Sequence, residues 1–190
     1  MPIEIEAKLK VDSHDPTRQR LRTIGAAPLG TWLETNTFFD GEDRSLLAAD
    51  RGLRLRSARD VNTKTTTYTL TYKGPRMHGP LKSREEQEVI VGGAPETIAL
   101  LGCLGYGPVI SFEKRRESWK LESCRVELDE LPFLGYFVEI EGSSEKAVMR
   151  VREQLGLDQR PIVKASYIAL LTTHLQEEGD SGRTITFTAK

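Results

Sequence analysis

The N-terminal segment, residues 3–10, alternates apolar and charged residues with a period of two. Successive side chains of an extended strand point to opposite faces. The charged face of this strand carries Glu4, Glu6, Lys8 and Lys10. Carboxylates side by side supply oxygen ligands for a divalent cation, and a neighbouring lysine balances phosphate charge. Because charged strand faces are usually solvated, a functional interpretation requires the pattern to recur on other strands.

The overall composition limits the class of protein. A chain of 190 residues predicts one domain with a substantial core. We place this domain at residues 1–175, followed by a polar tail, 176–190, with a short strand predicted at 184–189. With 27 basic and 28 acidic residues, the chain is nearly neutral, which argues against binding nucleic acid through overall charge.

Neither a membrane segment nor a cysteine framework is expected. No apolar run approaches the length of a membrane span. Cys103 and Cys124 are far apart, and the histidines are isolated, so no zinc site is predicted. Unpaired thiols are typical of a reduced protein, and we therefore expect a cytoplasmic location.

Hydrophobic periodicity predicts a chain dominated by strands with a few helices. Strands are predicted at 32–40, 53–59, 68–73, 83–91, 109–120, 124–131 and 136–141. Helices are predicted at 15–24, at 95–104, after Ser144 as far as Leu155, and at about 164–175. Polar stretches and Gly-Pro pairs separate these elements.

Charged residues recur in alternation on the predicted strands. Acidic residues gather on the first strand and on the last two, at Glu4, Glu6, Asp129, Glu139 and Glu141. Basic residues gather on the middle strands, at Arg54, Arg56, Lys73, Lys114 and Arg116. If the sheet closes on itself, these side chains line a lumen with an acidic and a basic wall. The apolar faces then point outward and are covered by the amphipathic helices.

The motif Glu4-x-Glu6-x-Lys8 resembles the ExExK signature of the CYTH proteins, also called triphosphate tunnel metalloenzymes. Similar segments follow in family order to about residue 171: 53–56, 70–75, 83–86, 112–116, 128–130, 134–141 and 166–167. They look most like the class IV adenylyl cyclase branch, and the family also includes thiamine triphosphatases. The resemblance implies an α+β fold: a closed antiparallel eight-stranded barrel, the triphosphate tunnel, covered outside by helices.

The resemblance also implies roles for individual residues. Magnesium or manganese would be held by Glu4, Glu6, Asp129, Glu139 and Glu141. The triphosphate would be bound by Lys8, Arg54, Arg56, Lys73, Lys114 and Arg116, with Arg84 as a further candidate in the lumen. The residues assigned to catalysis are Glu4, Glu6, Lys8 and Glu139. Tyr167 is expected to pack its helix against the barrel.

Three functions are compatible with this set of residues. The first is metal-dependent hydrolysis of tripolyphosphate, thiamine triphosphate or ATP, which we favour because the assigned residues serve phosphates and metal and none reads adenine. The second is a class IV adenylyl cyclase that makes cyclic AMP and pyrophosphate. The third is a non-catalytic protein that binds polyphosphate or nucleotides. The resemblance also implies a homodimer.

Overall fold

The structure is a computed structural model that describes residues 3–77, 79–179 and 182–188. Its main strands are β1 (Ile3–Val11), β2 (Ala27–Asp40), β3 (Gly52–Asp60), β4 (Thr66–Lys73), β5 (Lys82–Val91), β6 (Gly107–Leu121), β7 (Cys124–Leu131) and β8 (Gly135–Gly142). A short strand, β9 (Thr184–Ile185), follows near the C-terminus. The strands predicted up to residue 141 are confirmed. The strand predicted at 184–189 is shorter than expected, because β9 ends at Ile185 and residues 186–188 are not in a strand; Ala189 lies outside the described residues.

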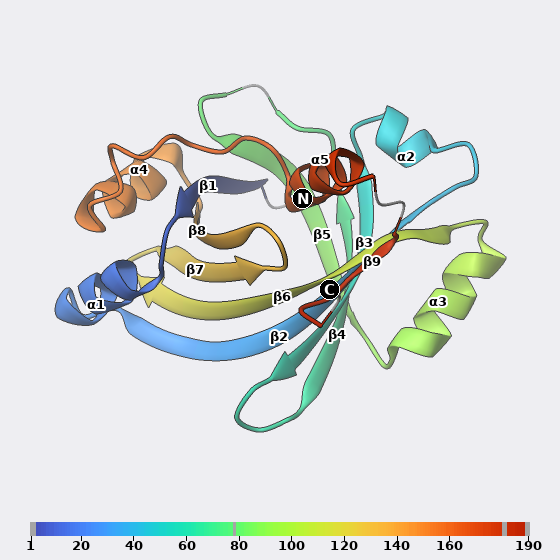
Figure 1. Ribbon diagram of the computed structural model, residues 1–190, viewed down its shortest axis with the longest axis horizontal. Coiled ribbons are helices and arrows are strands. Elements are labelled where there is room, and N and C mark those ends of the chain that lie inside the picture. The colour runs from blue at the N-terminus through green and yellow to red at the C-terminus, as the bar shows by residue number, and fades with distance from the viewer. Residues whose placement is uncertain (1–2, 78, 180–181, 189–190) are drawn as a thin grey trace.

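The eight main strands close into an antiparallel barrel in the order β2-β3-β4-β5-β1-β8-β7-β6 (Figure 1). Pairing of β2 with β6 closes the barrel, with Ala27 opposite Lys120 at one end and Asp40 opposite Gly107 at the other. The β9 strand adds to β6 in parallel, beside Ser111. The predicted closed barrel is therefore confirmed.

Five helices are present in the described part of the chain: α1 (Asp15–Thr23), α2 (Ser45–Ala48), α3 (Ala94–Cys103), α4 (Glu145–Gln154) and α5 (Tyr167–Glu177). All but α2 were predicted. Ser144 accepts a hydrogen bond from the backbone N–H of Ala147, and Ser166 accepts one from Ala169, so each serine caps the helix that follows it. Within the described ranges, no helix is both long and apolar enough to cross a membrane.

The apolar faces of β1, β7 and β8 point outward. Ala7, Leu9 and Ile140 are completely buried there, in one cluster with Val148 and Val151 of α4. In Figure 1, α1 and α4 lie on this side of the barrel and α3 lies on the opposite side. This arrangement follows from strand alternation, because residues that face away from a charged lumen need a hydrophobic cover.

Two smaller clusters complete the outer packing. Leu101 of α3 covers Phe39 and Leu55 of the β2–β3 side. Helix α5 and strand β9 contribute to a third cluster, in which Leu171 and Ile185 are fully or almost fully buried. The helices thus surround the barrel as predicted, and α5 brings its first turns to the lumen.

Candidate active site

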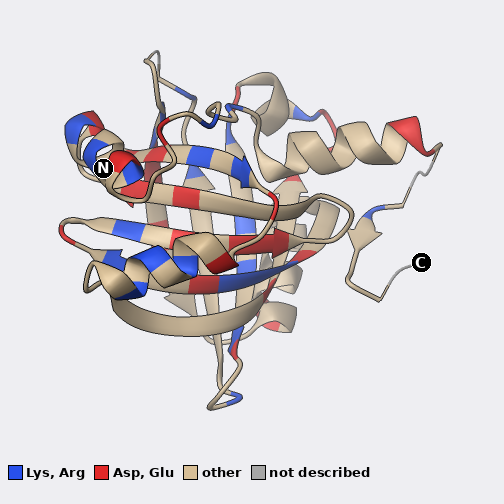
Figure 2. Cartoon of the chain, turned by 60° about the vertical axis from the view of Figure 1, so that its left-hand side comes forward, with Lys and Arg blue, Asp and Glu red and all other residues tan. Residues whose placement is uncertain are grey.

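The inward faces of the strands enclose a cavity of about 730 Å³. Figure 2 shows the charged positions as short bands along the strands, separated by uncharged residues. The predicted residues that line the cavity are Glu4, Glu6, Lys8, Arg54, Arg56, Lys73, Arg84, Lys114, Arg116, Glu139 and Glu141. The structure therefore gathers the expected residues around one space, with Asp129 as the exception.

Strand register brings the N-terminal motif next to the glutamates of β8. Lys8 lies opposite Glu139, and Glu6 lies opposite Glu141. The Nζ of Lys8 is 3.3 Å from a carboxylate oxygen of Glu139 and 4.1 Å from the centre of the Tyr167 ring. It also donates a hydrogen bond of 3.1 Å to the carbonyl of Ala165. Lys8 is thus held rigidly between the acidic wall and the start of α5.

Asp129 lies beneath Arg116 and is completely buried. Two nitrogens of Arg116 donate to the two carboxylate oxygens of Asp129, at 2.7 and 2.6 Å, and Nη2 also donates to Glu139 at 2.6 Å. The Tyr167 hydroxyl donates to Asp129 at 3.0 Å. Burial would lower the pKa of Arg116, but Asp129 and Glu127 hold this pKa well above its usual range. Asp129 therefore fixes Arg116, and its oxygens are already occupied by donors.

Strand β2 contributes a carboxylate that sequence reasoning missed. Glu34 is buried, and its Oε2 lies 3.3 Å from both Arg56 Nε and Lys114 Nζ. Burial alone would raise the pKa of Glu34, but Arg56 and Lys114 hold it far below its usual range. Arg56 also donates to Asn36 at 3.2 Å. Glu34 and Asn36 are two positions apart on β2 and therefore point to the same face. This spacing was the sequence feature from which Glu34 could have been predicted to belong to the site.

One part of the cavity has more positive charge than its partners neutralise. Arg54 donates to Thr71 at 3.1 Å and to Glu88 at 3.3 Å. Yet the buried Nε atoms of Arg54 and Arg84 have no hydrogen-bond partner among the described residues. Burial and the nearby Arg56 lower the pKa of Arg54 to about 10. Burial and Arg54 likewise lower the pKa of Lys73 to about 8. Such a surplus of buried positive charge favours an anionic ligand.

The acidic wall has the opposite imbalance. Burial raises the pKa of Glu4 despite the attraction of Lys73, and the neighbouring Glu86 and Glu6 raise it further. Burial and the proximity of Glu4 raise the pKa of Glu141 well above its usual range. These carboxylates are short of positive charge, which a divalent cation would supply.

The carboxylates fit a metal ion that takes some of its ligands from the protein and the others from a bound substrate. Across the described ranges, no three acidic, histidine or cysteine side chains stand close enough together to hold a metal ion by themselves. Magnesium, however, usually takes only one or two protein carboxylates and completes its shell with waters and substrate phosphates. The pair Glu4 and Glu141, beside Glu6 and Glu139, meets that smaller requirement.

The chain belongs to the CYTH domain family, whose pattern it matches over residues 2–165. The Methanocaldococcus jannaschii protein named "Putative adenylate cyclase MJ0240" is 29% identical over 177 residues, covering 88% of this chain and 98% of the relative. The PH1819 protein of Pyrococcus horikoshii has a similar structure, with a TM-score of 0.78, 26% identity, and coverage of 90% of this chain and 99% of that chain.

A second solved structure shows the same fold at lower sequence identity. HpAC1 from Hippeastrum, for which a dominant triphosphatase activity is described, has a TM-score of 0.70 and 20% identity to this chain. The comparison covers 92% of this chain and 96% of HpAC1. These similarities establish the family and the barrel.

Proposed function

We propose that this protein is a divalent-metal-dependent triphosphatase that hydrolyses its substrate inside the barrel. The observation that supports this most directly is the paired imbalance of charge in one cavity. Buried Nε atoms of Arg54 and Arg84 have no partner among the described residues, while Glu4 and Glu141 are short of positive charge. A triphosphate accompanied by a divalent cation supplies both missing charges.

Each side chain has a role that follows from its contacts. Arg54, Arg84 and Lys73 would bind phosphate oxygens, the arginines through Nε donors that have no partner among the described residues. Arg56 and Lys114 are oriented toward the same space by Glu34. Asp129 is a positioning residue, because it acts through Arg116.

The metal site would use Glu4, Glu6, Glu139 and Glu141. Magnesium or manganese, when bound, supplies charge stabilisation to the phosphate oxygens. Glu139 is held ionised, since Lys8 and Arg116 outweigh the effect of burial and keep its pKa well below the usual range. It would accept a hydrogen bond from the attacking water and so orient it. The water oxygen bonds to the terminal phosphorus, the bond to the bridging oxygen breaks, and the diphosphate part of the substrate leaves. One proton of the water stays on the released phosphate and the other passes to a phosphate oxygen of the products.

The alternative is a class IV adenylyl cyclase, which the name of the Methanocaldococcus jannaschii relative supports. In that reaction the ribose 3′-hydroxyl attacks the α-phosphate and pyrophosphate leaves. The same cations and carboxylates would serve it. The two reactions differ in the position of the substrate along the cavity.

The decisive experiment compares tripolyphosphate, thiamine triphosphate and ATP, each with magnesium, with manganese and with a chelator. Products are separated as phosphate, pyrophosphate and cyclic AMP. We expect phosphate release that requires metal. Cyclic AMP with pyrophosphate as the main products would establish the cyclase instead, and binding without turnover of any triphosphate would show a non-catalytic protein.

Substrate binding should weaken as the pH rises through about 8, where free Lys73 loses its proton. An anion favours the protonated lysine, so the Kd for substrate should rise by up to about tenfold per pH unit above that point. In Lys73→Arg the guanidinium stays charged and this dependence should disappear. Calorimetric titration from pH 7 to pH 9.5 measures it.

The matched control for this pH dependence is Lys82→Arg. Burial would lower the pKa of Lys82, but Glu6, at 2.8 Å, raises it above the usual value. Lys82 therefore stays protonated throughout, and its replacement should leave the pH dependence unchanged. The same pH dependence in Lys73→Arg and in the unaltered protein would disprove the role of Lys73.

A further inference from the structure

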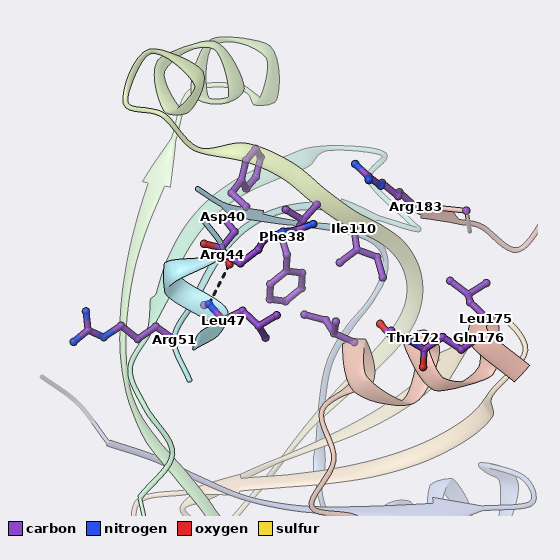
Figure 3. A pocket seen from close by; sticks show the side chains of 15 residues that line it. Phe38, Asp40, Arg44, Leu47, Arg51, Ile110, Thr172, Leu175, Gln176 and Arg183 are labelled. Atoms are coloured by element: carbon purple, nitrogen blue, oxygen red, sulfur yellow. Dashed lines mark hydrogen bonds between the residues drawn. The ribbon is translucent and has the colours of Figure 1, made fainter. Parts of the chain in front are cut away.

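Helix α5 reaches the charged cavity with its first turn. Tyr167, the first residue of the helix, is buried and lines that cavity together with Ile168 and Ala169. The following turns border a second cavity, of about 450 Å³, where Figure 3 shows Thr172 and Gln176 on α5. The start of α5 is thus the part of the helix that enters the charged site, and Tyr167 is its largest side chain there.

The ring of Tyr167 lies close to two cations. Its centre is 4.1 Å from the Nζ of Lys8 and 5.6 Å from the Nζ of Lys114. At such distances the face of an aromatic ring attracts a cation, and the attraction is strongest where water is excluded. Both lysines are almost completely buried. They come from β1 and β6, which β8 and β7 separate in the barrel, so one ring contacts cations from two distant strands.

The hydroxyl of Tyr167 acts on a third cation. It donates to Asp129 at 3.0 Å, and the Asp129 carboxylate also accepts from two nitrogens of Arg116. Burial and Asp129 raise the pKa of Tyr167 well above its usual range, so the hydroxyl keeps its proton and remains a donor. Tyr167 therefore contacts Lys8 and Lys114 directly and acts on Arg116 through Asp129.

An aromatic face attracts an ammonium group without neutralising it. Lys8 already has two carboxylates near it, those of Glu139 at 3.3 Å and of Glu6 at 3.7 Å. A third carboxylate in the place of Tyr167 would oppose the binding of phosphate. The ring instead fixes the position of the Lys8 Nζ and leaves its positive charge in place.

We propose that Tyr167 is a positioning residue that aligns Lys8, Lys114 and Arg116 for the phosphates of the substrate. The inference deepens the proposed function and rests on it. It gives the first turn of α5 a part in substrate binding, beyond the packing role that was expected from the sequence.

The test measures the Kd for tripolyphosphate by calorimetry in a chelator, which prevents turnover, and kcat/KM with magnesium. Tyr167→Phe removes only the hydroxyl, whereas Tyr167→Leu removes the ring as well. We expect the Kd to rise by about threefold in Tyr167→Phe and by about thirtyfold in Tyr167→Leu, with kcat/KM falling at least as much.

The matched control is Leu171→Ala, one turn further along the same face of α5. Leu171 is fully buried in the third cluster and lines neither cavity. Its truncation should lower the Tm at least as much as Tyr167→Phe does, yet change the Kd by less than about twofold. An equal rise in Kd in Leu171→Ala and in the Tyr167 variants would overturn the proposal, because it would show that loosening α5 is sufficient.

A double-mutant cycle with Lys8→Met tests the contact between ring and lysine. In the Lys8→Met protein, Tyr167→Leu should raise the Kd by only about threefold, because the cation that the ring holds is already gone. Effects that simply multiply would overturn that coupling.

Tyr167→Phe differs from the unaltered protein by one oxygen atom, so it should fold even if Tyr167→Leu does not. An unchanged Kd in the Tyr167 variants of an active enzyme would overturn the positioning role and leave the triphosphatase intact. Failure of the unaltered protein to bind or hydrolyse any triphosphate would overturn the proposed function itself.

Discussion

Glu4→Gln should lower kcat with magnesium by roughly a thousandfold, the upper range for losing one electrostatic contributor to a transition state. Glu4 is partly buried among other carboxylates, and its raised pKa shows a group short of positive charge. Glutamine keeps the shape but removes the charge that a metal needs. Steady-state phosphate release measures the effect.

The fold should survive this change, because Glu4→Gln removes a partly buried charge that is poorly neutralised. We expect the Tm without metal to stay the same or rise, while the rise in Tm on adding magnesium is lost. Glu85→Gln, on β5 opposite Ile3 and in the outward phase, is the control and should keep both activity and the magnesium effect. Full activity in Glu4→Gln would refute the proposed metal site.

Arg116→Met should destabilise the protein by about 3–5 kcal/mol, the usual cost of removing one partner from a buried ionic network. Arg116 lies within hydrogen-bond distance of Asp129 and Glu139, and 3.9 Å from Glu127. Methionine fills much of the volume but leaves these carboxylates without their cation. Urea unfolding followed by circular dichroism measures the difference.

The neighbouring arginine provides the control. Arg115 points outward and pairs with Glu130 at 3.0 Å with half of its side chain exposed, so Arg115→Met should cost less than about 1 kcal/mol. Adding Asp129→Asn to Arg116→Met should recover part of the lost stability, because one uncompensated charge is removed. Equal losses in Arg115→Met and Arg116→Met would show that the buried network adds nothing to stability.

The barrel could be predicted because alternation is a local signal. In β1, the phase of Glu4 and Glu6 against Ile3 and Ile5 already fixes which face is charged, and the same reasoning holds on the strands that follow. Closure of the sheet into a barrel could be predicted because charged residues recur on one face of many strands and because the chain resembles the CYTH proteins. The N-caps at Ser144 and Ser166 are likewise local features, because a serine caps the helix that directly follows it.

Other parts of the site depend on contacts that no local pattern reports. Asp129 shares the inward phase of β7, yet Arg116 and Tyr167 occupy its oxygens, which only the packed structure reveals. Helix α2 is a single turn, too short for a helical period to be visible. The cavity of about 450 Å³ beside the barrel combines residues of five elements, namely β2, α2, β3, β6 and α5, and of the segment before β9, so it could not be inferred from any one stretch.

The seam between β2 and β6 has a consequence for how the molecule assembles. It pairs Ala27 with Lys120 and Asp40 with Gly107, which are far apart in the sequence. Such contacts form late in folding, because the entropy cost of closing the long loop between them must be overcome first. Until the seam forms, the cationic groups of Arg56 and Lys114, which both lie 3.3 Å from the Glu34 carboxylate, need not approach one another. A polyanion present during refolding would therefore act as a template, screening their mutual repulsion at the step where the ring of strands completes.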